Sequence, residues 1–201
     1  MDVLKEIGNI GAGHAATSLS QLLQHKVEMH VPSVRMVDFD EMMELGGGAE
    51  KKMVSVFLRM EGDAPGSMFF VLSPEQARRF VSMMIHSEDV QFDQPPYDEL
   101  AISALHELGN ILTGSYLSSL ADFTNLDLHP SVPSIAIDMV GATLSFGLIE
   151  LSQVSDQAIV IETCLSTEET EQQDVKGHFF LLPDPGSYEK VFRSLGVETD
   201  E

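Results

Sequence analysis

The sequence has few of the features that mark extracellular, membrane or metal-dependent proteins. Its 201 residues include one cysteine, Cys164, and no tryptophan. One cysteine cannot form an internal disulfide, and its apolar neighbours favour a packed strand position over a reactive thiol. No apolar run approaches the roughly 20 residues that span a bilayer, and the N-terminus has no basic segment before an apolar stretch. We therefore expect a cytoplasmic protein that does not enter membranes.

Basic residues are also scarce. The chain has 11 Lys and Arg against 32 Asp and Glu, and its formal net charge is −21. Such a charge repels nucleic acid and acidic membranes, so neither is expected as a partner, and a basic or metal-loaded protein fits better. Part of the acidity lies in the run TEETEQQD at 167 to 174. We interpret this run as a solvated loop.

The sequence resembles itself at an offset of 101 residues. DVLKEIGNIGAGHAA at 2 to 16 aligns with SALHELGNILTGSYL at 103 to 117, and PSVRM at 32 aligns with PSIAI at 133. Similarity at a fixed offset indicates a duplicated structural unit. Because each half alone would bury too little surface to be stable, we expect one domain over 1–201. Its internal repeats would cover about 1–92 and 98–197.

Each repeat has the pattern of a long helix, several strands and a short helix. Apolar residues recur every three or four positions over 2 to about 23 and about 98 to 121, which predicts the long helices. Gly62, Pro65 and Gly66 predict a turn between antiparallel strands. The expected fold is α/β (α+β), with the long helices packed on a mainly antiparallel sheet that both halves share about a pseudo-twofold axis. Strands are expected at 27–31, 33–37, 53–60, 67–72, 134–137, 158–165 and 178–182.

The candidate functional residues are two Glu and Asn pairs on the long helices. Glu6 and Asn9 are three residues apart, as are Glu107 and Asn110. Each pair therefore projects from one helix face, with side chains about 5 to 6 Å apart. One such pair would be an ordinary solvated face. Its recurrence at the same point of a repeat favours a functional site in each half.

A glycine lies inside each pair. Gly8 and Gly109 each cost a helix interior about 1 kcal/mol relative to alanine. We interpret this cost as a sign of close approach by another backbone or a partner. Gly109→Ala is then expected to leave folding largely intact and to impair activity. The alternative is that Gly109 serves packing inside the protein.

Several familiar motifs are excluded by their context. GAGHAA at 11 to 16 has the form of a dinucleotide-binding fingerprint, but a helical pattern precedes it where a strand is required. HELGN at 106 to 110 begins like a zinc-protease helix, yet Asn110 stands where the second histidine ligand is needed. The chain also has no P-loop or nucleophile elbow, and its seven histidines form no ligand-spaced cluster. We therefore expect no metal or cofactor of its own.

The order of residues in both pairs resembles the signature of the CheC, CheX and FliY group of response-regulator phosphatases. In that signature an acidic or hydroxyl residue is followed by Glu four positions on, Asn three later and Pro after 22 more residues. Two complete motifs resemble the CheC branch, because CheX carries one and FliY appends a flagellar-switch domain that is missing here. The first helix begins almost at Met1, so its site is expected to be less well supported. The motifs are Asp2, Glu6, Asn9 and Pro32, then Ser103, Glu107, Asn110 and Pro133.

The resemblance implies a phosphatase that hydrolyses the aspartyl phosphate of the response regulator CheY. Asn9 and Asn110 would each orient the attacking water, and Glu6 and Glu107 would pair with the regulator's lysine. Mg²⁺ would come with the regulator. Both asparagines lie on a surface face, so replacing either with alanine should change stability by less than about 1 kcal/mol.

A second partner is implied as well. Proteins of the CheC branch bind the receptor deamidase CheD, here expected near 138–150. The alternative function is a non-catalytic adaptor that sequesters phosphorylated CheY or modulates CheD.

Overall fold

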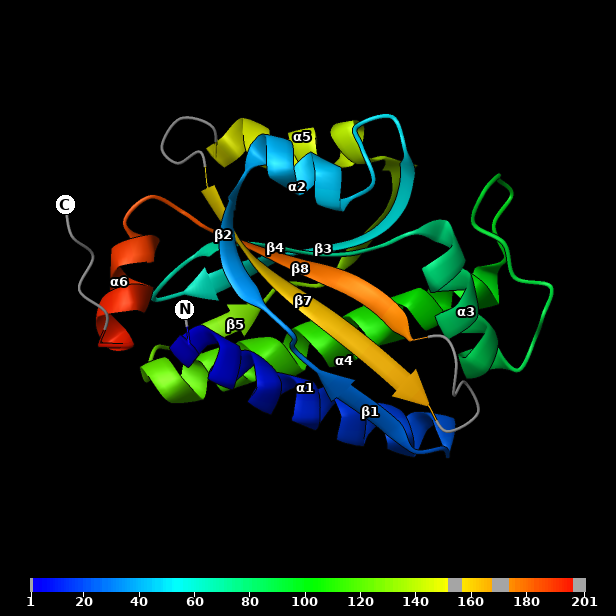
Figure 1. The fold of residues 1–201 in the computed structure, drawn as a ribbon, viewed down its shortest axis with the longest axis horizontal. Coiled ribbons are helices and arrows are strands. Elements are labelled where there is room, and N and C mark those ends of the chain that lie inside the picture. Colours follow the sequence, from blue (N-terminus) through cyan, green and yellow to red (C-terminus); the bar gives the residue numbers. More distant parts are fainter. Residues whose placement is uncertain (1, 152–156, 168–173, 197–201) are drawn as a thin grey trace.

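Two long helices and a central sheet organise the fold. The computed structural model describes residues 2–151, 157–167 and 174–196 (Figure 1). Helices α1 (Asp2–Leu23) and α4 (Glu99–Thr124) lie side by side in opposite directions across one face of the sheet. Helices α2 (Phe39–Leu45) and α5 (Val140–Leu151) cover the other face. Most of the acidic run, 168–173, lies outside the described residues.

The eight described strands form one antiparallel sheet in the order β1-β7-β8-β4-β3-β5. Strand β2 also pairs with β7, and β6 also pairs with β3. Two short helices, α3 (Pro74–Ile85) and α6 (Ser187–Ser194), follow the second and fourth pairs of strands along the chain. The strands are β1 (Val27–His30), β2 (Val34–Asp38), β3 (Lys52–Gly62), β4 (Gly66–Leu72), β5 (Leu128–Pro130), β6 (Ser134–Met139), β7 (Gln157–Thr167) and β8 (Val175–Pro183).

Strands from the two halves of the chain are exchanged within this sheet. Strands β1 and β2 pair with β7 of the second half, whereas β5 and β6 pair with β3 of the first. The central pair is β4 and β8, one from each half. The predicted fold class, a mixed protein with an antiparallel sheet under long helices, is confirmed. The exchange supports a duplicated unit, although the duplication and its twofold symmetry stay predictions.

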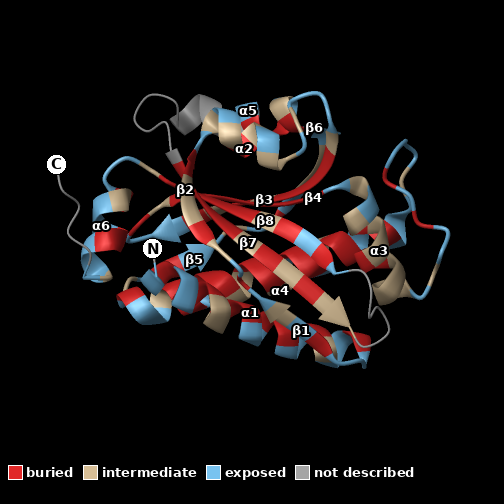
Figure 2. Ribbon diagram, viewed as in Figure 1, coloured by how far each residue is buried: buried red, intermediate tan, exposed pale blue. Residues whose placement is uncertain are grey.

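Alternation along the central strands fills a core on each face of the sheet. In β4, Met68, Phe70 and Leu72 pack in the core under α1 and α4, whereas Phe69 and Val71 pack in the core under α2 and α5. Side chains of a strand point to opposite faces in turn, so a strand covered on both sides must be apolar throughout. Strand β4 is buried along its whole length, and Figure 2 shows mostly buried residues in its neighbours as well.

Small residues let α1 and α4 approach each other closely. Gly11, Ala12 and Ala15 are buried in α1. A Cβ atom added at Gly11 would lie 3.1 Å from the Cα of Tyr116. The GAGHAA run therefore serves the contact between two helices, which agrees with its exclusion as a nucleotide-binding loop.

Most predicted elements are present, with boundaries close to those expected. The predicted turn at 62 to 66 joins β3 and β4 as an antiparallel hairpin. Gly62 has φ +107°, and a Cβ atom there would lie 2.1 Å from the carbonyl oxygen of Asp127, so glycine is required. Helices α2 and α5 and the short strand β5 were not predicted. For α2 a signal exists, because Asp38 caps the helix by accepting a hydrogen bond from the Glu41 amide.

Cys164 lies in β7 as predicted, but it is half-buried. Burial raises the pKa of its thiol, which lowers the fraction of reactive thiolate at neutral pH. Over the described ranges, no helix has both the length and the apolar character needed to cross a bilayer.

Candidate functional site

The two predicted Glu and Asn pairs lie on the outer faces of α1 and α4. Glu6 and Glu107 are exposed, Asn9 is half-buried and Asn110 is exposed. Both helices bury their opposite faces against the sheet and each other, which leaves these positions toward solvent (Figure 2). Asp98 begins α4 by accepting a hydrogen bond of 2.9 Å from the Ala101 amide.

Asn9 is held by hydrogen bonds to the protein itself. Its Oδ1 accepts a bond of 3.0 Å from the backbone N–H of Val31, and its Nδ2 donates one of 3.0 Å to the carbonyl oxygen of Lys5. Val31 is only 2% exposed, so its N–H needs this partner. This hydrogen bond joins two residues 22 positions apart, which gives a structural reason for the distance in sequence between the asparagine and the proline of the motif. Asn9 fixes the residue directly before Pro32, at the junction of β1 and β2.

Asn110 has different surroundings. In the described part of the chain no hydrogen bond to its side chain is found, and Val132, which aligns with Val31, is 89% exposed. The junction of β5 and β6 is held to β3 instead. There the Ser131 amide donates 2.8 Å to the carbonyl oxygen of Arg59, and the Arg59 amide donates 2.9 Å to Ser131 Oγ. The carboxamide of Asn110 is thus available to an approaching molecule.

The two glycines face the interior of the protein. A Cβ atom at Gly109 would lie 2.6 Å from Cγ1 of Val56 in β3, and one at Gly8 would lie 3.3 Å from Cγ2 of Val31. Both glycines are buried. The expectation that Gly109→Ala leaves folding intact is therefore wrong, because the close neighbour of Gly109 is the sheet.

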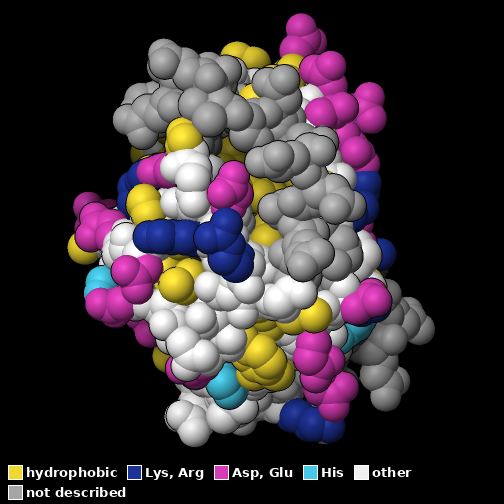
Figure 3. Space-filling model, turned by 90° about the vertical axis from the view of Figure 1, so that its left-hand side faces the viewer, with side chains coloured by type: hydrophobic (Ala, Val, Ile, Leu, Met, Phe, Trp, Pro, Cys, Tyr) yellow, Lys and Arg dark blue, Asp and Glu magenta, His cyan; other side chains and the backbone are white. Residues whose placement is uncertain are grey.

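Acidic side chains are spread over the end of the molecule from which α1 begins. Figure 3 views the end of the molecule where α6 and the start of α1 lie, with acidic side chains along its edges and a smaller basic group near the middle. Within the described ranges, no group of three or more His, Cys, Asp and Glu could hold a metal ion. A partner that docks beside Glu6 or Glu107 must therefore supply complementary positive charge.

A carboxylate and a carboxamide on one helix face permit a limited chemistry. The amide of asparagine can donate and accept hydrogen bonds, so it can orient a water molecule, but it cannot take up a proton at neutral pH. A glutamate one turn earlier can pair with a cation and fix the docking distance. Such a pair suits a reactive group that a partner would bring to it.

Solved structures with the same fold define the structural class. FliY from Thermotoga maritima superposes with a TM-score of 0.73 at 23% identity, covering 97% of this chain and 94% of that one. The middle domain of FliM from H. pylori gives a TM-score of 0.67 at 11% identity, covering 96% of each chain. At these identities the likeness concerns the fold. The chain has the fold shared by these FliY and FliM domains.

Sequence comparison then gives the family. The model of the CheC-like family matches residues 1–36 and 100–137, the segments that contain both Glu and Asn pairs. A protein of Bacillus subtilis (strain 168) named CheY-P phosphatase CheC is 50% identical over 197 residues, which is 98% of this chain and 94% of that protein. The chain belongs to the CheC-like family. The family predicted from the two motifs is confirmed.

Proposed function

We propose that this chain is a phosphatase that accelerates hydrolysis of the aspartyl phosphate on a CheY-type response regulator. The similarity to the B. subtilis phosphatase, 50% identity over nearly the whole chain, supports the reaction class. The observation that carries the proposal is the exposed carboxamide of Asn110, one turn after the exposed carboxylate of Glu107. Each side chain projects from a rigid helix packed on the sheet, which suits a group that must be positioned accurately.

The proposed mechanism leaves most of the electrostatic stabilisation to the regulator. An aspartyl phosphate is an activated acyl phosphate, and the regulator holds it beside Mg²⁺ and a lysine. Asn110 enters this site and orients a water in line with phosphorus, while Glu107 pairs with the lysine and fixes the depth of insertion. The water's oxygen bonds to phosphorus as the bond to the aspartyl oxygen breaks. The products are inorganic phosphate and the free aspartate.

Glu6 and Asn9 form a second site of the same kind in this proposal. Asn9 is half-buried, and its carbonyl oxygen is directed at the Val31 amide. It can project less far into a partner than Asn110 while this bond persists. We therefore assign the larger share of activity to α4.

The test is a single-turnover measurement of phosphate release. A regulator phosphorylated beforehand is mixed with Mg²⁺ and with or without this chain, and free phosphate is followed over time. We expect faster release than the regulator's own decay. The non-catalytic alternative, an adaptor that sequesters the phosphorylated regulator, predicts slower release.

A CheD-type deamidase is the second partner we propose, at the opposite face of the sheet. Helix α5 lies there, beside α2 and away from α1 and α4 (Figure 1). Met139, directly before α5, is 49% exposed and offers an apolar contact. Binding at this face would leave both motif helices open to the regulator. We also propose that the chain meets both partners in the cytoplasm. Calorimetry with CheD in the absence and presence of the regulator tests whether the two bind together.

A further inference from the structure

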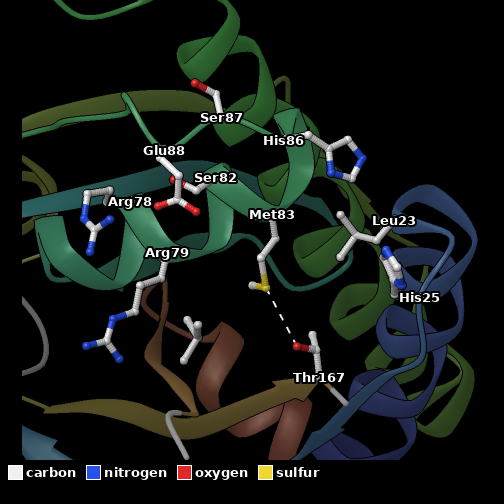
Figure 4. Close-up of a pocket in the computed structure, with 11 residues that line it drawn as sticks. Leu23, His25, Arg78, Arg79, Ser82, Met83, His86, Ser87, Glu88 and Thr167 are labelled. Carbon is white, nitrogen blue, oxygen red and sulfur yellow. Dashed lines mark hydrogen bonds between the residues drawn. The ribbon is translucent and has the colours of Figure 1, made fainter. Parts of the chain in front are cut away.

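A cavity of about 520 Å³ lies near the C-terminal end of α1, and none of its described lining residues belongs to either motif. It is bounded by α3, by the end of α1 and by the adjoining ends of β7 and β8 (Figure 4). Leu23, which lines it, follows Asn9 by 14 positions in α1, about 21 Å along the helix axis. Cavities of this size accommodate small molecules.

Two of the chain's 11 basic residues line the cavity. Arg78 and Arg79 both line the cavity from α3, and His25 and His86 stand at its other end (Figure 4). Arg79 pairs with Glu75 at 2.5 Å. Arg78, in contrast, has no carboxylate partner among the described residues. An unpaired guanidinium in a concave site is a binding group for an anion.

An unsatisfied donor lies one turn further along the same helix. The Oγ of Ser82 is buried and has no hydrogen-bond partner among the described residues. Ser82 follows Arg78 by four positions, so both side chains lie on one face of α3 and line the cavity together. Buried hydroxyl groups without a partner are uncommon, and a ligand oxygen would supply the missing acceptor.

The rest of the lining is partly apolar. Leu23, Met83 and Val175 contribute apolar side chains, and the sulfur of Met83 accepts a weak hydrogen bond of 3.9 Å from Thr167. Met83 is flexible and polarisable, which suits a surface that adapts to a ligand. Glu88 is the one carboxylate among the described residues that line the cavity, and it lies beside Ser82 (Figure 4).

We infer that this cavity binds a small molecule that carries an anionic group on a short apolar body. The anionic group accepts hydrogen bonds from Arg78 and Ser82, and the apolar body packs against Leu23, Met83 and Val175. The net charge of −21 repels free anions at a distance, so binding depends on these local contacts. The site is separate from the proposed phosphatase reaction and does not depend on it.

Calorimetry with three matched probes tests the inference. Octyl phosphate and octanoate carry an anionic group on the same chain, and octanol is the uncharged control. We expect one-to-one binding of at least one anion, at least tenfold tighter than that of octanol. The anion that binds more tightly identifies the preferred head group as phosphate or carboxylate. Equal binding of all three probes, or binding of neither anion, would overturn the inference.

Two arginine variants locate the site. Arg78→Gln is expected to weaken binding of the anion about tenfold. Arg193→Gln removes the same charge from α6, where the arginine is 84% exposed, and should bind like the parent. Melting temperatures of both variants show whether either change disturbs the fold, and Arg78→Lys retains the charge should the glutamine variant fail to fold. Equal losses in the Arg78 and Arg193 variants would show a general charge effect and contradict the assignment.

Discussion

Asn9 and Asn110 occupy equivalent positions in the two motif copies, yet their side chains have different environments. Asn9 is hydrogen-bonded at both ends of its carboxamide, to Val31 and to Lys5. Asn110 is exposed and has no such partner among the described residues. Identical spacing in the sequence has therefore produced one amide that supports the scaffold and one that is free to meet a partner.

The difference originates in the strand junctions that follow the helices. Val31 is buried, so its amide relies on Asn9, whereas Val132 is exposed and makes no hydrogen bond to Asn110 among the described residues. Ser131 secures the second junction to Arg59 of β3. Once another residue holds the junction, the asparagine is released from a structural role.

The largest expected effect is that of removing both asparagines. Loss of one oriented polar group from a reacting centre typically lowers the rate about 100- to 1000-fold at that site. The variant with both Asn9→Ala and Asn110→Ala should therefore approach the regulator's own rate of dephosphorylation, measured by single-turnover phosphate release. A folded double variant with the parent rate would contradict a role for either helix.

The single variants should separate the two roles. Asn110→Ala is expected to remove the larger share of activity with little change in stability. Asn9→Ala should remove less activity but lower the free energy of unfolding by about 1 to 3 kcal/mol, because the buried Val31 amide loses its acceptor. This loss of stability is larger than the change of less than about 1 kcal/mol that the sequence predicts for a surface asparagine. Urea unfolding measures it.

Asn9→Asp serves as the matched control for that pair. Aspartate keeps an oxygen for the Val31 amide but cannot donate a hydrogen bond when ionised. We expect it to recover most of the stability lost in Asn9→Ala without recovering the activity of that site. Equal stabilities of the alanine and aspartate variants would show that the Val31 bond contributes little.

Replacing Gly109, inside the second motif, and Gly114, just after it, with alanine should change the stability of the protein in opposite directions. Gly109→Ala places a methyl group 2.6 Å from Val56, an overpacking that should cost about 1 to 3 kcal/mol. At Gly114 the added methyl group would have no neighbour within 4 Å, so Gly114→Ala should stabilise α4 by up to about 1 kcal/mol. Gly8→Ala, with its nearest contact at 3.3 Å, should cost less than Gly109→Ala. Thermal unfolding of the three variants provides the ranking, and a stabilised Gly109→Ala would refute the packing role.

The smallest effect is expected at Tyr116, which aligns with Ala15 of the first copy. Its hydroxyl lies 3.0 Å from Thr163 Oγ1, and Tyr116→Phe should cost about 1 kcal/mol at neutral pH. Burial raises the pKa of Tyr116 to about 12. The fold therefore favours the neutral phenol, and this contribution is present below about pH 10 and lost as the pH rises toward 12.

Unfolding of parent and Phe variant at pH 8 and pH 11 isolates that contribution. The stability of the parent should fall more between the two pH values, because only the parent has the Tyr116 phenol. Tyr188, whose pKa burial also raises to about 12, is common to both proteins and cancels in the difference. Parallel losses in the two proteins would show that Tyr116 is not linked to unfolding.

Elements with a strong periodic pattern were predictable, and elements that depend on distant contacts were not. The long helices and the alternating strands follow from local spacing of apolar residues, because each has a face to bury. Strand β5 has three residues, and its pairing with β3 joins positions about 70 residues apart. Helix α5, VGATLSFGLIEL, is apolar on most sides, so no amphipathic pattern marks it.

The sequence by itself determined the family, the two motif helices, and the fold class of helices on an antiparallel sheet. These depend on residue identity and spacing along the chain, which a repeat makes visible. Only the tertiary structure decided how the copies differ. Whether Gly109 faces a partner or Val56, and whether an asparagine meets water or the Val31 amide, depends on atoms that are far apart in sequence and brought together by packing. The cavity beside Arg78 and Ser82 exists for the same reason, since α1, α3, β7 and β8 each supply part of its lining.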